Sequence, residues 1–188
     1  MQFKKILFLT NTNDNESLLQ EVIRLVENDN SSLVIMATYP SLPSNFSSHK
    51  TSYEEFLIAK IREQVSKVNT SMNLISRISY VVETQETLAI KVIKYAIKES
   101  CDLIVKQVEP LQHGVGFKAY DMEILRKSPV PVWLKTEKTL KSGIKKVAVA
   151  IDPESDEEPA IELSIKMLKM AEAISKSYNA ELNVVSCW

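Results

Sequence analysis

The sequence is poor in glycine and cysteine. Only 3 of its 188 residues are glycine, whereas glycine makes up about 7% of an average protein. Backbone N–H groups approach phosphate oxygens most closely at glycine, so the scarcity argues against a glycine-rich phosphate loop. The 2 cysteines, Cys101 and Cys187, form no C-x-x-C pair and lie far apart in the sequence. This spacing indicates neither a zinc site nor a disulfide framework.

The sequence also lacks an excess of charge and a long apolar run. Its net charge is -1, which gives no electrostatic case for binding nucleic acid or acidic lipid. No apolar run approaches the roughly 20 residues of a membrane helix, and the first ten residues lack the features of a signal peptide. The content of 45% hydrophobic and 25% charged residues is ordinary for globular proteins. We therefore expect a cytoplasmic protein with no membrane span and no nucleic-acid partner.

Short apolar runs alternate with segments of helical periodicity up to residue 136. The expected strands are residues 6–10, 33–37, 78–82, 103–108 and 131–134. The expected helices are residues 15–28, 52–68, 88–97 and 120–127. Residues 39–50 are rich in serine and proline and should form a loop before a helix that starts at the capping-box sequence of Ser52 to Glu55. The alternation predicts an α/β fold: a five-stranded parallel sheet with helices on both faces, as in Rossmann-like domains.

The sequence contains an internal repeat of its first segment. Residues 145–152 read K-K-V-A-V-A-I-D, and residues 4–11 read K-K-I-L-F-L-T-N. A helix near 161–171 and a strand at 182–185 should follow the repeat, so that a partial second β-α-β unit is expected. We therefore predict a domain at 1–137, a linker at 138–144 and an incomplete second domain at 145–188. A fragment of this size cannot close a core alone, so it should dock on another domain or chain unless the protein is longer.

Residues 102–134 contain the strongest candidate for a binding site. The expected strand 103–108 is followed by a loop with two of the three glycines and by a short helix. Ligands of open α/β sheets bind where loops leave the carboxyl ends of the strands. The candidate pocket therefore comprises residues at the ends of the first, second and fourth strands and in this loop: Asn11, Ala37, Val105, Gly114 and Gly116.

The same stretch resembles the universal stress protein family. The resemblance rests on D-L-I-V-K at 102–106, on L-R-K-S-P-V-P-V-W-L at 125–134, and on the repeated K-K start. It is closest to the tandem E-type, in which two such domains lie in one chain. It covers residues 4–136 as one domain and 145–188 as the first third of another. The resemblance implies the Rossmann-like fold of that family and a role in the stress response.

Many members of this family bind ATP, and the resemblance implies where such a site would lie. They use an Asp at the end of the first strand, a G-x-x-G loop after the fourth strand and a G-[ST] pair further on. Here Asn11 replaces the Asp, residues 113–116 read H-G-V-G, and Lys118 and Ala119 replace the pair. The second copy keeps an Asp, Asp152. We therefore expect no family-type phosphate binding, and hence no ATP cofactor, in the first domain.

Val132 and Trp133 suggest a surface for association. They place apolar side chains on the expected last strand, and an edge strand invites pairing with another strand. The resemblance implies dimers or paired domains near this strand. We therefore expect self-association or domain pairing there.

Three functional hypotheses remain open. The first is a non-catalytic stress-response protein that binds partners or a small ligand and has lost the family's ATP motif in its first domain. The second is a regulatory protein that binds ATP or AMP in a rearranged pocket at the candidate residues. The third is a nucleotide-dependent transferase or hydrolase. The sequence lacks the S-G-G-x-D-S, H-x-G-H and G-x-S-x-G motifs of such enzymes, which argues against this hypothesis. No metal site is expected, and Cys101 should be a buried small hydrophobe.

Overall fold

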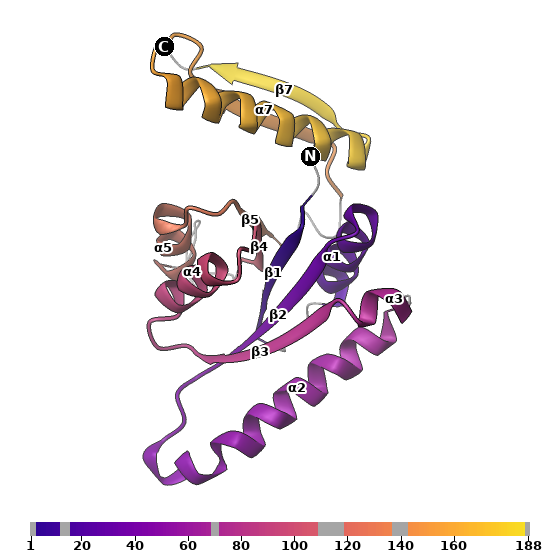
Figure 1. The fold of residues 1–188 in the computed structure, drawn as a ribbon, viewed down its shortest axis with the longest axis vertical. Helices are drawn as coiled ribbons and strands as arrows, with labels where there is room; N and C mark the ends of the chain where they lie inside the picture. Colours follow the sequence, from indigo (N-terminus) through magenta and orange to yellow (C-terminus); the bar gives the residue numbers. More distant parts are fainter. Residues whose placement is uncertain (1–2, 12–15, 69–71, 109–118, 137–142, 187–188) are drawn as a thin grey trace. The chain divides into compact units, whose positions relative to one another are not determined.

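A computed structural model describes residues 3–11, 16–68, 72–108, 119–136 and 143–186 (Figure 1). The chain divides into two compact units, with the boundary between residues 140 and 141. The expected residues Gly114 and Gly116 of the candidate pocket lie outside the described residues.

The first unit is built on a five-stranded parallel sheet. Its strands follow the order β3-β2-β1-β4-β5. Their bounds are Lys5–Thr10 (β1), Ser32–Tyr39 (β2), Ile78–Thr84 (β3), Leu103–Gln107 (β4) and Val132–Lys135 (β5). The central strands β1 and β2 are buried almost throughout, as expected for parallel strands that are covered on both faces. The predicted fold class is confirmed.

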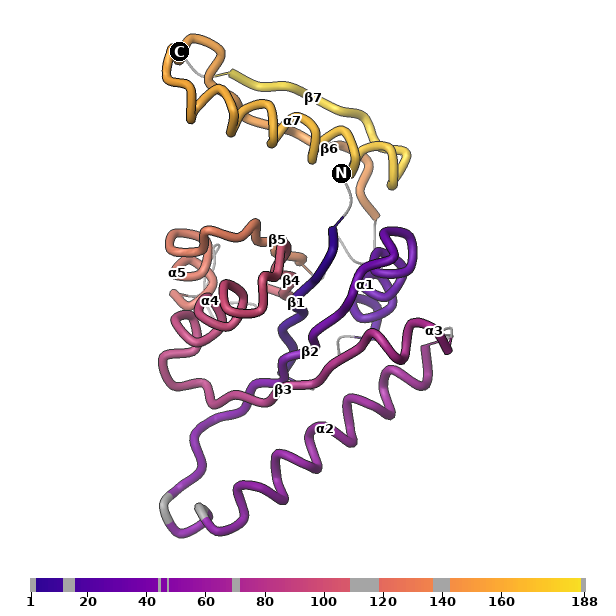
Figure 2. Tube along the Cα trace, in the orientation of Figure 1, coloured from indigo at the N-terminus to yellow at the C-terminus, as the bar shows by residue number. Residues whose placement is uncertain are grey.

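Helices cover both faces of this sheet. They are α1 (Glu16–Asp29), α2 (Lys50–Lys67), α3 (Met72–Ile75), α4 (Leu88–Lys98) and α5 (Ala119–Lys127). Helices α4 and α5 lie on one face, and α1 and α2 lie on the other (Figures 1 and 2). On the α4 face, strand side chains such as Leu7, Leu9 and Ile104 form one buried cluster with Val92 and Ile124 of the helices. This packing attaches α4 and α5 to one face of the sheet.

The start of α2 differs from the prediction. A 3₁₀ turn, η1 (Ser44–His49), runs directly into α2, which begins at Lys50 and has no side-chain cap on its first turn. Ser52 is therefore already inside the helix and does not cap it. The S-x-x-E spacing also arises inside a helix, where it carries no capping information. The short helix α3 was not predicted either, because its four residues are too few to show a period.

The second unit is a single β-α-β element. Strand β6 (Lys146–Ile151) pairs in parallel with β7 (Glu181–Ser186), and α7 (Glu158–Tyr178) connects them. Among the residues of this unit that the structure describes (143–186), three are buried: Val149, Ala171 and Ser175. Large apolar side chains of α7 and β7 stay exposed, among them Leu163, Val184 and Val185.

Candidate functional site

The ends of β1 and β2 meet at the carboxyl edge of the sheet. Thr10, the last residue of β1, stands in register with Ala37 of β2, and the Thr38 hydroxyl donates a 3.5 Å hydrogen bond to the Thr10 carbonyl oxygen. Asn11 follows directly and is half-buried. Ala37 is fully buried. Among these residues, the side chain of Asn11 is therefore the one that a ligand at this edge could reach.

Val105 lies deeper in the sheet. It is in register with Phe8 of β1 and Trp133 of β5, and it is buried. The structure thus brings Asn11 and Ala37 together at the edge and places Val105 below them.

A buried ion pair lies at the end of β4. The side-chain ammonium of Lys106 is 2.9 Å from Oδ1 of Asp121, and the two side chains are 9% and 0% exposed. Lys106 also donates a 2.9 Å hydrogen bond to the carbonyl oxygen of Gln107, and its ammonium lies 5.2 Å from the centre of the Tyr120 ring. Since Asp121 belongs to the first turn of α5, this pair joins the end of β4 to the start of the following helix.

The carboxylate of Asp121 is incompletely satisfied. Its contact with Lys106 has the distance of an ion pair, but neither oxygen accepts a hydrogen bond from any described residue. A fully buried carboxylate normally accepts several hydrogen bonds, because burial without them is costly. The charge of Lys106 and the partial positive charge at the N-terminus of α5 offset part of that cost.

A second buried lysine lies on the other face of the sheet. Lys135, at the end of β5, is 2.7 Å from Oε1 of Glu21 in α1, and its side chain is 3% exposed. Its ammonium also lies 4.8 Å from the centre of the Trp133 ring. Each of these two buried lysines is therefore paired with a carboxylate of the chain itself.

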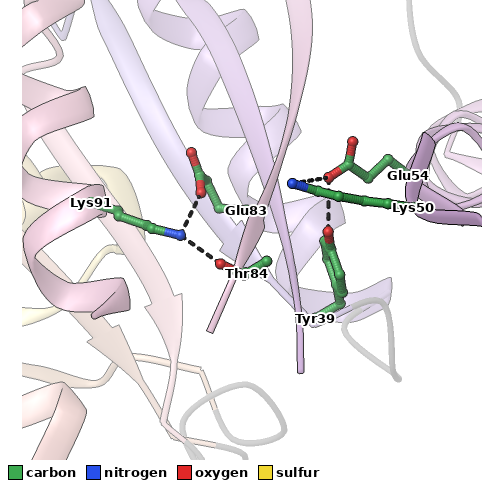
Figure 3. Close-up of polar contacts among 6 residues, drawn as sticks. All are labelled: Tyr39, Lys50, Glu54, Glu83, Thr84 and Lys91. Atoms are coloured by element: carbon green, nitrogen blue, oxygen red, sulfur yellow. Dashed lines mark hydrogen bonds and ion pairs between the residues drawn. The ribbon is translucent and has the colours of Figure 1, made fainter. Parts of the chain in front are cut away.

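Polar contacts also fix the ends of β2 and β3 (Figure 3). The Tyr39 hydroxyl donates a 2.8 Å hydrogen bond to Glu54 of α2, which also lies 3.8 Å from the ammonium of Lys50. On the opposite side, Lys91 of α4 binds Glu83 and Thr84 at the end of β3. These contacts attach a helix on each face of the sheet to neighbouring strand ends.

An open groove of about 520 Å³ lies away from the carboxyl edge, between α2 and the beginning of β3. Its walls combine apolar side chains, such as Ile58, Val65 and Ile78, with Arg62 and Tyr80. The guanidinium of Arg62 lies 5.2 Å from the centre of the Tyr80 ring. Because the groove borders the amino end of β3, it is distinct from the predicted pocket.

The described residues contain no cluster of acidic, histidine or cysteine side chains that could hold a metal ion. Nor does any helix there have both the length and the apolar character needed to cross a membrane. Cys101 is buried, as predicted, and burial raises the pKa of its thiol to about 11. A thiol that keeps its proton is a poor nucleophile.

Sequence reasoning did not identify the pair of Lys106 and Asp121. The available signal was a lysine inside the apolar strand L-I-V-K-Q-V, where a lysine needs a partner. The nearest acidic residue on the following helix is Asp121, followed by Glu123. Whether Asp121 or Glu123 pairs with Lys106 is decided by the packing of α5 on β4, which the sequence does not give.

No protein-family model matches the chain, and no curated protein matches it. Solved structures do match. A universal stress protein from Pseudomonas aeruginosa superposes with a TM-score of 0.68 at 20% sequence identity, and the match covers 98% of this chain and 61% of that one. The chain therefore spans less than two thirds of that relative.

Shorter structures match about the length of the first unit. Universal stress protein UspA from Lactobacillus plantarum has a TM-score of 0.52 at 14% identity, with 71% of this chain and 98% of that chain covered. A universal stress protein in complex with cAMP has a TM-score of 0.50 at 15% identity, with 71% and 97% covered. The chain thus has the fold of the universal stress proteins, which is the resemblance that its sequence predicted.

Proposed function

We propose that the chain is a non-catalytic stress-response protein that acts by binding partners or a small ligand, without holding ATP phosphates in its first unit. We further propose that the protein has the tandem arrangement of the E-type and lies in the cytoplasm. The fold alone leaves the activity open, because one fold hosts many functions.

The observation that carries the proposal is the pairing of Lys106 with Asp121. Lys106 is the cation at the end of β4, where a phosphate group would need positive charge. The carboxylate of Asp121 lies 2.9 Å from it and neutralises it. The first residue of α5, Ala119, has no hydroxyl to donate to a phosphate oxygen. A triphosphate at this position would face a buried carboxylate of like charge.

Calorimetric titration with ATP and Mg²⁺, together with thermal unfolding, tests the proposal. A ligand at 100 times its dissociation constant stabilises the fold by about 2.7 kcal/mol. We expect neither heat nor stabilisation at millimolar ATP. Saturable ATP binding would refute the loss of phosphate binding. The non-catalytic role would be refuted if phosphate were released from ATP at a rate proportional to the concentration of the purified protein, and if an Asn11→Ala variant released none.

A regulatory protein that binds AMP or ATP is the second candidate. It is favoured by the accessible Asn11 side chain at the end of β1 and by the universal stress protein of similar fold that was solved with cAMP. An amide can accept and donate hydrogen bonds, so it could contact an adenine edge. If this candidate is correct, AMP binds saturably, and Asn11→Ala weakens that binding in a variant that circular dichroism shows to be folded.

A further inference from the structure

We infer that Asp121 is an internal counter-anion: its carboxylate fills an anion site formed by Lys106 and the first turn of α5. Asp121 would then be the residue that excludes phosphorylated ligands from this end of the sheet. The inference deepens the proposed function and rests on it, since it explains why the first unit would not hold phosphates.

The position of the pair is that of an anion site. Lys106 lies near the end of a parallel strand, and Asp121 lies in the first turn of the nine-residue helix that follows it. The N-terminus of a helix offers unpaired N–H groups and partial positive charge to an anion. The carboxylate of Asp121 belongs to the first turn of this helix and lies 2.9 Å from the lysine ammonium, so it occupies the space beside the lysine that a bound oxyanion would need.

The contacts of Asp121 indicate that its carboxylate serves as a charge and not as part of a hydrogen-bonded network. The side chain is fully buried, and no described residue donates a hydrogen bond to either oxygen. A structural carboxylate at such a depth would normally have several donors. Its close contact is the 2.9 Å ion pair with Lys106. An oxyanion of equal charge could therefore replace it without breaking hydrogen bonds to the described residues.

The other buried lysine provides a matched comparison. Lys135 is also paired with a carboxylate, that of Glu21, at 2.7 Å. Glu21 lies inside α1, more than one turn from its first residue, and it is partly exposed. Removing Glu21 would take a carboxylate from a buried lysine without opening the N-terminus of a helix. Comparing the two sites therefore shows whether phosphate binding needs only a buried lysine without its carboxylate, or needs the lysine together with the N-terminus of a helix.

The experiment uses the full chain and inorganic phosphate as the probe. Asp121→Ala removes the carboxylate and leaves space, whereas Asp121→Asn removes the charge at nearly constant size. Melting temperature is recorded against phosphate and against chloride at equal ionic strength, and binding is measured by titration calorimetry. We expect Asp121→Ala to bind phosphate at least about tenfold more tightly than the unchanged chain. Asp121→Asn should gain less binding, and Glu21→Ala should gain none.

Adding Lys106→Met to Asp121→Ala should abolish the gained binding. The inference is overturned if the folded Asp121 variants bind phosphate no better than the unchanged chain, or if Glu21→Ala gains as much. If Asp121→Ala is unfolded, phosphate should restore its fold, because the added anion would replace the missing charge. Failure of phosphate to restore any unfolded Asp121 variant would equally overturn it.

These outcomes differ from those that test the proposed function. Saturable ATP binding by the unchanged chain would refute the proposed function, whatever the variants do. An unchanged chain that binds neither ATP nor phosphate, together with Asp121 variants that also bind none, would refute the internal counter-anion alone.

Discussion

The carboxylate of Asp102 accepts a 3.1 Å hydrogen bond from the backbone N–H of Lys5, and its second oxygen accepts a 2.7 Å hydrogen bond from the N–H of Lys4. Asp102 precedes β4, and Lys5 begins β1. One side chain thus satisfies two backbone donors at the amino end of the sheet. It fixes the position at which β1 and β4 start to pair.

Replacing Asp102 with Ala should therefore destabilise the first unit. Two backbone donors lose a charged acceptor, and a hydrogen bond to a charged group contributes about 1.5 to 3 kcal/mol. We expect the free energy of unfolding to fall by about 2 kcal/mol, measured by urea denaturation. Asp102→Asn keeps one side-chain acceptor oxygen and should lose less. Equal stability of all three proteins would show that the two contacts do not matter for folding.

The fold could be predicted from the sequence because its signals are local. Apolar runs such as Ile6–Leu9 and Leu33–Ala37 are long enough to require burial on both faces, and these segments are the buried centre of the sheet. The sequence misleads where one spacing of residues occurs in two structural settings. The S-x-x-E spacing at Ser52 suggested a helix start, but the preceding turn η1 already leads the chain into α2.

The candidate site could be predicted less well, because it depends on contacts between distant segments. The sequence placed Asn11 at the end of β1, and the structure agrees. It gave no reason to select Asp121 as the partner of Lys106, since that choice is made by the packing of α5. The sequence predicts Val105 at a strand end, but its register with Phe8 places it inside the sheet, before the end of β4. Periodicity alone does not give register between strands.

The buried pair of Lys135 and Glu21 should be important for stability. Glu21→Ala removes the carboxylate 2.7 Å from an ammonium whose side chain is 3% exposed. Removing one partner of a buried pair costs about 3 to 5 kcal/mol, and the partial exposure of Glu21 favours the lower end of this range. Urea denaturation measures the loss. Glu63→Ala breaks the exposed contact with Lys67 at 2.8 Å and should change stability little.

A paired substitution provides the control for this prediction. Glu21→Leu combined with Lys135→Met removes both charges and keeps apolar volume, so most of the lost stability should return. A double variant as unstable as Glu21→Ala would mean that the two side chains stabilise the fold by packing and not by their charges.

Cys101 should react with alkylating reagents only when the chain unfolds. Burial raises the pKa of its thiol from 9.0 to about 11, so the thiolate fraction near neutral pH falls by roughly 100-fold. The side chain is also 5% exposed. A Cys187→Ser variant leaves Cys101 as the single thiol. We expect slow labelling of the native variant and rapid labelling in urea; rapid labelling of the native protein would contradict the buried position.

The open edge of β5 should mediate the self-association proposed from the sequence. The carbonyl oxygen of Pro131 accepts a 2.9 Å hydrogen bond from the N–H of Ile104 in β4, and that of Lys135 accepts a 2.8 Å hydrogen bond from the N–H of Val108, the residue after β4. Since backbone groups alternate in direction, the N–H of Leu134 points away from β4. Leu134→Pro removes this outward donor and should yield a monomer in sedimentation velocity, while Leu134→Ala should still associate. Replacing Val132 with a charged residue is a poorer test of association, because Val132 packs against the core and its replacement would also disturb the fold.

Two results would contradict association through this edge. The unchanged chain could be monomeric at every concentration, or Leu134→Pro could associate as strongly as Leu134→Ala. Circular dichroism must show that Leu134→Pro keeps its fold, since proline is tolerated on an edge strand only where its missing N–H was unpaired.

The stability of the first unit should fall at high pH because of Tyr39. Burial, followed by the hydrogen bond to Glu54, raises the pKa of its phenol from 10.0 to about 12. The folded chain thus holds this proton more tightly than the unfolded chain. The resulting stabilisation is complete below pH 10 and is lost as the pH rises towards 12. Tyr39→Phe should cost about 1 kcal/mol at neutral pH and should remove this part of the pH dependence.

Comparing the two proteins isolates Tyr39 from other groups that titrate in the same range. Burial also raises the pKa values of Tyr80 and Tyr95, and these groups contribute equally to both proteins. Urea denaturation at several pH values between 9 and 12 gives the difference in unfolding free energy, which should shrink as the pH rises. A constant difference would mean that Tyr39 ionises equally well in the folded and unfolded chains, and that its contact with Glu54 does not hold the proton.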